Sequence, residues 1–241
     1  MTSTLPSRRG PELPYSVVAG VKPCATGWLV AAAKLHGTTF APEEPRVIEA
    51  FVDVLDQRPA FAVIALNAPI GYLEQLLPGG RTCDREARAL LGRRGAAIPS
   101  APIRSQVEEE GANESVEGLS AISRKLLPRY REVGTEMAPY RQRSVYEVTS
   151  ELSFFQLNDD MPLRWSKRSE RGQQERRGLL AKKIPGGERI FDAKLPRVPY
   201  SHMLDVAAFM WTARRIFARA GVRIPQDPEW DESGLRMEIV R

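Results

Sequence analysis

The sequence of 241 residues has little cysteine and no long apolar run, and both absences limit what the protein can be. Its two cysteines, Cys24 and Cys83, are too few for a disulfide framework and lack zinc-ligand spacing. No segment approaches the about 18 consecutive apolar residues that a membrane span requires. Residues 1–14 are polar, contain three prolines and lack the apolar stretch of a signal peptide. We therefore expect a cytoplasmic protein without membrane partners, preceded by a disordered lead-in over residues 1–14.

Positive charge is concentrated in two segments of a chain whose net charge is +5. Residues 164–183 hold eight basic side chains against two acidic ones, and residues 81–104 hold six arginines against two acids. Such clusters favour polyanions, because phosphate contacts supply most non-specific affinity for nucleic acid. A solvated helix and loop would carry the same charges without a ligand, so both interpretations stay open. If a nucleic acid or phosphorylated ligand binds, the expected contacts are Arg81, Arg85, Lys167, Arg168, Arg176 and Arg177.

Hydrophobic patterning predicts an N-terminal meander of antiparallel strands followed by strands and helices. The meander comprises residues 15–21, residues 28–33 and an extended piece after His36-Gly37, with a turn over residues 22–27. Residues 61–66 form a continuous apolar run that suits a central strand buried on both faces. A further strand is predicted at 144–148, and helices at 49–57, 82–91, 114–132 and 203–220.

Two features of the predicted helices indicate where one of them ends and how another packs. Pro128 should end or kink the third helix, because proline removes a backbone donor and clashes with the preceding turn. The last helix is apolar nearly all round, which indicates that it packs deep in the core. No repeat or linker interrupts the pattern, so we expect one domain over residues 15–241.

A series of short motifs then gives the chain a family resemblance. The segment Gly20 to Trp28, Gly-Val-Lys-Pro-Cys-Ala-Thr-Gly-Trp, resembles the opening Gly-Val-Asp-Gly-Cys-Arg-Gly-Gly-Trp of predicted ribonuclease-H-like nucleases filed as domain of unknown function 429. Similar elements follow in the same order: Asn67-Ala68-Pro69-Ile70-Gly71, Arg81-Thr82-Cys83-Asp84, Pro99 with Pro102, Leu127-Pro128-Arg129, Tyr146-Glu147-Val148, Ser166-Lys167-Arg168 and Gly234-Leu235-Arg236. The resemblance implies an α/β ribonuclease-H-like fold with a mixed central sheet, an N-terminal antiparallel meander and flanking helices.

The resemblance also implies a metal site, and this chain departs from it. In ribonuclease-H-like enzymes, carboxylates from the first strand, the fourth strand and the last helix hold two divalent cations for phosphodiester displacement. Lys22 and Asn67 stand where the family has aspartates, whereas Glu147 and Asp205 are retained. We expect Lys22, Asn67, Glu147 and Asp205 to form the centre, with Lys22 as a built-in cation close to both acids. No cofactor is expected; if the acidic site works, it would hold Mg²⁺ or Mn²⁺ through Glu147, Asp205 and His202.

Three functions remain open on these residues. The first is a pseudoenzyme that keeps a nucleic-acid- or nucleotide-binding surface without normal two-metal nuclease activity. The second is an active nuclease or phosphodiesterase that uses Glu147 and Asp205 with a further ligand such as His202, Glu151 or Asp84. The third is a scaffold repurposed as an enzyme on a small molecule, with Lys22, Glu147 and Asp205 as acid, base or binding groups. A fold alone cannot choose among them.

Overall fold

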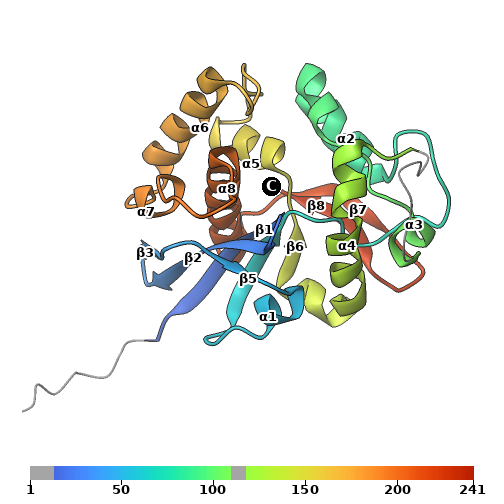
Figure 1. Cartoon of the computed structure of the whole chain (residues 1–241), viewed down its shortest axis with the longest axis horizontal. Helices are drawn as coiled ribbons and strands as arrows, with labels where there is room; N and C mark the ends of the chain where they lie inside the picture. Colours follow the sequence, from blue (N-terminus) through green and yellow to red (C-terminus); the bar gives the residue numbers. More distant parts are fainter. Residues whose placement is uncertain (1–13, 110–117) are drawn as a thin grey trace, which may run out of the picture.

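A six-stranded mixed sheet organises the chain in the computed structural model, which describes residues 14–109 and 118–241 (Figure 1). The predicted lead-in, residues 1–14, lies outside this range except for its last residue. Strands β1, β5 and β6 run parallel to one another, and β2 is antiparallel to β1. In sheet order the strands are β3 (Thr39–Pro42), β2 (Gly27–His36), β1 (Ser16–Cys24), β5 (Phe61–Leu66) and β6 (Val145–Glu147); β4 (Arg46–Ile48) also pairs with β2.

The predicted meander, central strand and later strand are therefore confirmed, but the predicted turn over residues 22–27 is too long. Strand β1 continues to Cys24, which pairs with Gly27 across a turn of only two residues. Lys22 lies inside the strand and pairs with Leu29. Its side chain therefore obeys the alternation of a strand and points to a defined face of the sheet.

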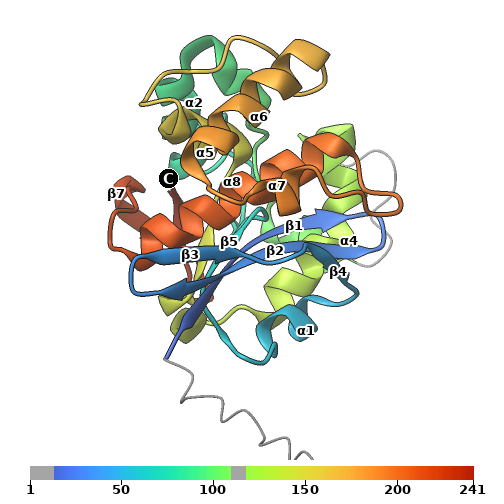
Figure 2. The same cartoon turned by 90° about the vertical axis from the view of Figure 1, so that its left-hand side faces the viewer.

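Helices cover both faces of the sheet (Figures 1 and 2). Alternate residues of β1 divide accordingly: Val18 packs with the helices α5 to α8, whereas Val17 and Ala19 pack with α1 and α4. On one face lie α5 (Ser150–Leu157), α6 (Glu170–Lys183), α7 (Glu188–Phe191) and α8 (Tyr200–Phe217). On the other lie α1 (Phe51–Leu55), α3 (Arg104–Glu108) and α4 (Ala121–Glu136), and η2 (Pro139–Arg143) leads into β6.

A close contact between α8 and β1 fixes the position of the last helix. A Cβ atom added to Gly20 would lie 2.3 Å from the backbone nitrogen of Met210 and 2.4 Å from the carbonyl oxygen of Val206. Only glycine permits this approach. The helix that bears Asp205 is thereby held directly over the strand that bears Lys22.

A third apolar cluster joins α2 (Thr82–Leu91) and α5 to the C-terminal hairpin of β7 (Arg223–Trp230) and β8 (Arg236–Val240), and η1 (Gly92–Ala97) follows α2. Cys83 is buried in it together with Ala87 and Leu91. In Figures 1 and 2, α2 and α6 stand at the same end of the molecule, beyond the sheet. Within the described residues, no helix is long and apolar enough to cross a membrane.

Two helix predictions need correction. Pro128 lies inside α4, which continues to Glu136 because Tyr130 and Val133, beyond the proline, are buried against the sheet. The predicted beginning of that helix, residue 114, lies outside the described residues. The last helix begins and ends three residues earlier than predicted, at Tyr200 and Phe217. Helices α5 and α6 and the β7–β8 hairpin were not predicted.

Candidate functional site: a cationic pocket at the end of the parallel strands

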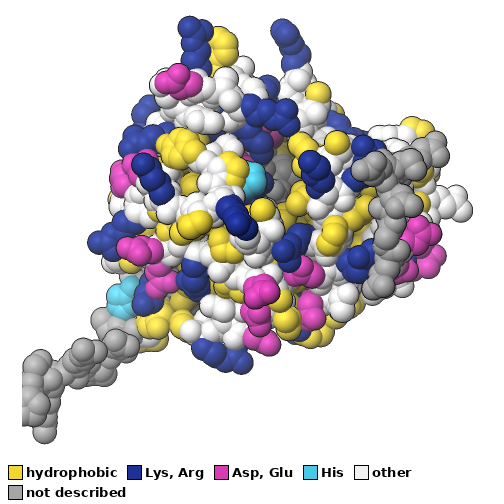
Figure 3. Space-filling model, in the orientation of Figure 1, with side chains coloured by type: hydrophobic (Ala, Val, Ile, Leu, Met, Phe, Trp, Pro, Cys, Tyr) yellow, Lys and Arg dark blue, Asp and Glu magenta, His cyan; other side chains and the backbone are white. Residues whose placement is uncertain are grey.

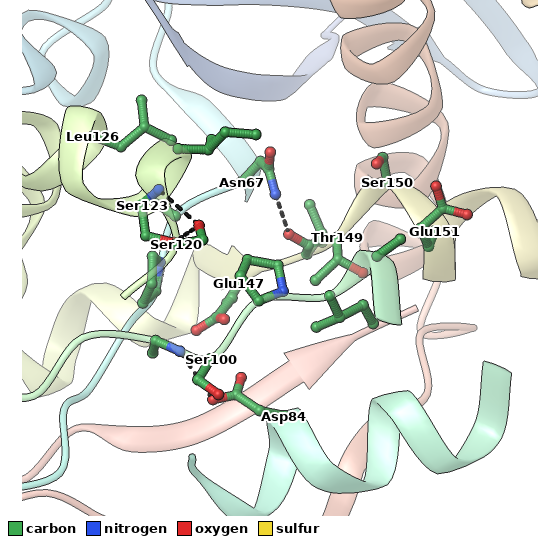
Figure 4. Close-up of a pocket in the computed structure, with 18 of the residues that line it drawn as sticks. Asn67, Asp84, Ser100, Ser120, Ser123, Leu126, Glu147, Thr149, Ser150 and Glu151 are labelled. Atoms are coloured by element: carbon green, nitrogen blue, oxygen red, sulfur yellow. Dashed lines mark hydrogen bonds between the residues drawn. The ribbon is translucent and has the colours of Figure 1, made fainter. Parts of the chain in front are cut away.

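A cavity of about 490 Å³ lies where β1, β5 and β6 end. Figure 3 shows a hollow on this face with Lys and Arg side chains around it. The carboxyl ends of parallel strands are a common place for ligands, because the loops that follow the strands diverge there. The polar lining comes mainly from Lys22, Asn67, Glu147, Thr149, Ser150, Glu151, Lys167 and Arg168, and the apolar lining from Ala68, Pro69, Ile98, Ile122 and Leu126; several of these are drawn in Figure 4.

Asp205 is a fully buried acid behind two lysines of the cavity lining, Lys22 and Lys167, which share one of its oxygens. The Nζ atoms of Lys22 and Lys167 lie 3.3 Å and 3.0 Å from its Oδ2 atom. Lys22 also donates to Oδ1 of Asn67 at 3.3 Å, and Lys167 donates to Oγ of Ser150 at 3.3 Å. Burial alone would raise the pKa of Asp205, but the charges of Lys167 and Lys22 outweigh it and hold that pKa below its ordinary value.

Lys22, Asn67 and Asp205 are thus brought together as expected, but Glu147 is not part of their cluster. The Glu147 carboxylate accepts from Arg81 at 2.6 Å and 2.8 Å and from the backbone N–H of Ile70 at 2.7 Å. Arg81 also binds the Asp84 carboxylate, at 2.8 Å and 3.2 Å. Of the two acids that Lys22 was expected to approach, its ammonium pairs with Asp205, while Glu147 pairs with Arg81.

Strand parity explains this separation. Glu147 pairs with Leu66 across the parallel strands β5 and β6, so both side chains point to the α4 face of the sheet. Lys22 follows Val21, which also belongs to the α4 face, and therefore points to the opposite face, toward α8. Asn67 follows Leu66 in the same way. The end of the sheet consequently separates an Arg81–Asp84–Glu147 cluster from a Lys22–Asp205–Lys167 cluster.

Two arginines that were expected to bind substrate are buried and paired with internal acids. Arg81 is 2% exposed, and its N–H groups are taken by Glu147, Asp84 and the carbonyls of Ile70 and Gly71. Arg176 is fully buried on α6 and donates to Glu151 at 3.0 Å. In the structure both guanidinium groups pair with internal acids, and their expected contact with a substrate stays a prediction.

The other expected contacts divide between the cavity and the outer surface. Lys167 and Arg168 line the cavity. Arg177 pairs with Asp192 at 2.6 Å, away from the cavity lining. Arg85 donates to the carbonyl of Gly80 and to Thr82 on the same helix. Arg94, which was not singled out, lines the cavity and donates to Glu151 at 3.0 Å.

The acids considered as metal ligands, Glu147 and Asp205, lie in separate clusters. Among residues 14–109 and 118–241, no group of three or more His, Cys, Asp or Glu side chains is placed to hold an ion. Asp205 and Glu147 belong to separate clusters, and each faces a cation. Burial and the nearby charge of Lys22 lower the pKa of His202 to about 4, so its ring is neutral at neutral pH. Asp84 and Glu151, considered as further ligands, are bound by Arg81 and by Arg94 with Arg176.

The sequence agrees with a family whose function has not been assigned. The model of the family described as protein of unknown function (DUF429) matches residues 20–230. The chain belongs to the DUF429 family. No curated protein and no solved structure matches it. In this DUF429 chain, three residues of the motifs, Arg81, Asp84 and Glu147, form one internal ionic cluster.

Proposed function

We propose that this DUF429 chain binds a phosphorylated ligand, such as a nucleotide or an end of nucleic acid, in the cationic pocket without two-metal hydrolysis. We also propose that its fold is ribonuclease-H-like. The order of its elements supports this assignment: a strand meander, a buried strand, helices, another strand and a buried helix over β1.

The observation that carries the proposal is the pair of lysines on Asp205. The cavity lining and the side chains directly behind it hold more cations than acids. The six cations are Lys22, Arg81, Arg94, Lys167, Arg168 and Arg176, and the four acids are Asp84, Glu147, Glu151 and Asp205. Each of these four carboxylates has a cationic partner within 3.0 Å. The excess positive charge is therefore free to attract an anion.

The same lysines oppose a divalent cation. Two unit charges at 4 Å interact by about 4 kcal/mol at the effective dielectric of a protein surface. A metal ion beside Asp205 would meet this repulsion from Lys22 and from Lys167, with twice the charge. Phosphate oxygens would instead be attracted by both ammonium groups and by Arg168 at the cavity wall.

Calorimetric titration of pyrophosphate into the protein in the presence of EDTA tests the proposal. We expect binding that weakens as salt is raised, because the contacts are ionic. Lys167→Gln should weaken it roughly 10- to 100-fold, the effect of a lost hydrogen bond to a charged group. The matched control is Lys183→Gln at the end of α6, whose ammonium pairs with the exposed Asp159 outside the cavity lining. Absence of binding at low salt, or an equal loss in both variants, would show that the pocket is not an anion site.

A further inference from the structure

We propose that Lys22 is a nucleophilic amine that forms an imine with an aldehyde or ketone bound in the cationic pocket. A phosphorylated carbonyl compound is the class of ligand that this combination suits. The choice of a phosphorylated compound depends on the proposed function above, whereas the reactivity of Lys22 depends on its own surroundings.

The geometry of the ammonium leaves one direction open. Lys22 is 8% exposed, lines the cavity, and donates to Asp205 and Asn67 at 3.3 Å each. Its nitrogen carries three hydrogens as an ammonium and two as a neutral amine. When the two partners keep two hydrogens, the fourth tetrahedral direction holds either the third proton or the lone pair. A lone pair in that direction can attack a carbonyl carbon in the cavity.

The second lysine, Lys167, makes it easier for Lys22 to lose its proton and become a neutral amine than it is for a surface lysine. Asp205 offers one negative charge to two ammonium groups, so one of the two positive charges stays uncompensated. Burial, followed by the charge of Lys167, lowers the pKa of Lys22 against the opposing effect of Asp205. Desolvation and a neighbouring cation are the two conditions that activate lysine as a nucleophile in proteins.

The reaction needs no redox partner. The lone pair of Nζ attacks the carbonyl carbon while the C=O π electrons move to oxygen, which takes a proton from the ammonium of Lys167. Asp205 accepts the proton that the attacking nitrogen loses. The Asp205 carboxyl then gives its proton to the carbinolamine hydroxyl, the C–O bond breaks, water leaves, and the nitrogen lone pair closes the C=N bond. The neutral amine of Lys167 takes the remaining N–H proton, so both side chains return to their starting charge. The products are one imine and one water molecule.

The two walls of the cavity indicate what the carbonyl compound looks like. Lys167 and Arg168 provide positive charge beside Lys22, while Ile122, Leu126 and Ile98 provide an apolar wall. Leu126 is drawn beside the cavity in Figure 4, on the same side as Ser120 and Ser123. A small compound with a phosphate, a carbonyl group and a flat apolar portion satisfies both walls, and 490 Å³ lies within the range of small-molecule sites.

Borohydride trapping with pyridoxal 5′-phosphate, and separately with pyridoxal, tests the inference. Reduction converts an imine into a stable secondary amine, and peptide mass spectrometry identifies the modified lysine. We expect Lys22 to be labelled first, before the exposed Lys183, because its lowered pKa leaves more of it as the neutral amine that reacts. Lys22→Arg, checked for folding by its melting temperature, should lose this label. The phosphate group should raise the rate further, and pyrophosphate should compete.

Each result separates the inference from the proposed function. Labelling of Lys22 by pyridoxal with no gain from the phosphate supports the reactive lysine and counts against the anion site. Binding of pyrophosphate to the wild-type protein, with label found only on exposed lysines, overturns the reactive lysine and leaves the anion site standing. Peptide mapping of the wild-type protein decides this even if Lys22→Arg does not fold.

Discussion

Arg81→Met is expected to lower the free energy of unfolding by about 3–5 kcal/mol, the usual cost of removing one partner from a buried ionic cluster. Arg81 is 2% exposed and neutralises both Asp84 and Glu147. Without it, two carboxylates remain buried in an apolar setting, and burial already raises the pKa of Glu147 against the opposing charge of Arg81. The melting temperature of a chain of this size should fall by roughly 6 to 20 °C.

Urea denaturation measures this loss, and a neighbouring arginine provides the control. Arg85→Met removes an exposed guanidinium from the same helix, whose partners are the carbonyl of Gly80 and Thr82. We expect it to change the free energy of unfolding by about 0.5 kcal/mol or less. Glu147→Gln in the Arg81→Met background should restore part of the stability, because it removes one of the unpaired charges. Equal effects of the two single substitutions would contradict the structural role of Arg81.

Asp205→Asn is expected to destabilise the protein by about 3 kcal/mol or more at neutral pH. The substitution keeps the size of the side chain but leaves Lys22 and Lys167 facing each other without their shared counter-charge. Lys22 would then have to lose its proton or turn away from the cavity. Asp192→Asn, which breaks an exposed pair with Arg177, should cost about 1 kcal/mol or less.

The difference between wild type and Asp205→Asn should depend on pH in one direction. The folded-state pKa of Asp205 lies below the ordinary value of 3.8, mainly because Lys167 and Lys22 overcome the effect of burial. Its stabilisation is therefore fully present above pH 3.8 and is lost as the pH falls through the folded-state pKa. Urea denaturation from neutral pH down to acid should show the two proteins converging. A gap that stays constant with pH would mean that the Asp205 carboxylate is not the stabilising group.

The fold was predictable wherever one pattern dominated. The apolar run 61–66 became β5 without change, and the apolar segment around residues 203–217 became the buried helix α8. Helix α6 was missed because its buried side is formed by Gly172, Arg176 and Leu180, which give no amphipathic signal. Pro128 misled the prediction of α4, since packing on both sides of the proline outweighs the missing hydrogen bond.

The site was predictable by residue but not by grouping. The four expected centre residues all line or border the same end of the sheet, yet Glu147 faces away from the other three. Parity of the strands contains this information, but only once the register between β5 and β6 is known. The contact between Lys167 and Asp205 could not be predicted either, because nothing in the sequence around Lys167 indicates that it pairs with an acid 38 residues later. Which basic residues are buried counter-ions depends on packing, and charge counts cannot distinguish Arg176 from Arg168.

The central claim is that lysines occupy the place of a metal beside Asp205, and titration with Mn²⁺ followed by electron paramagnetic resonance tests it most directly. Aqueous Mn²⁺ gives a sharp signal that is lost on binding, so the signal reports free metal. The variant Lys22→Asp with Asn67→Asp returns carboxylates to the strand ends and is the positive control, which should remove signal as it binds Mn²⁺. Wild-type protein is predicted to leave the signal proportional to the added metal. Stoichiometric loss of the signal with wild-type protein, abolished by Asp205→Asn, would contradict the account.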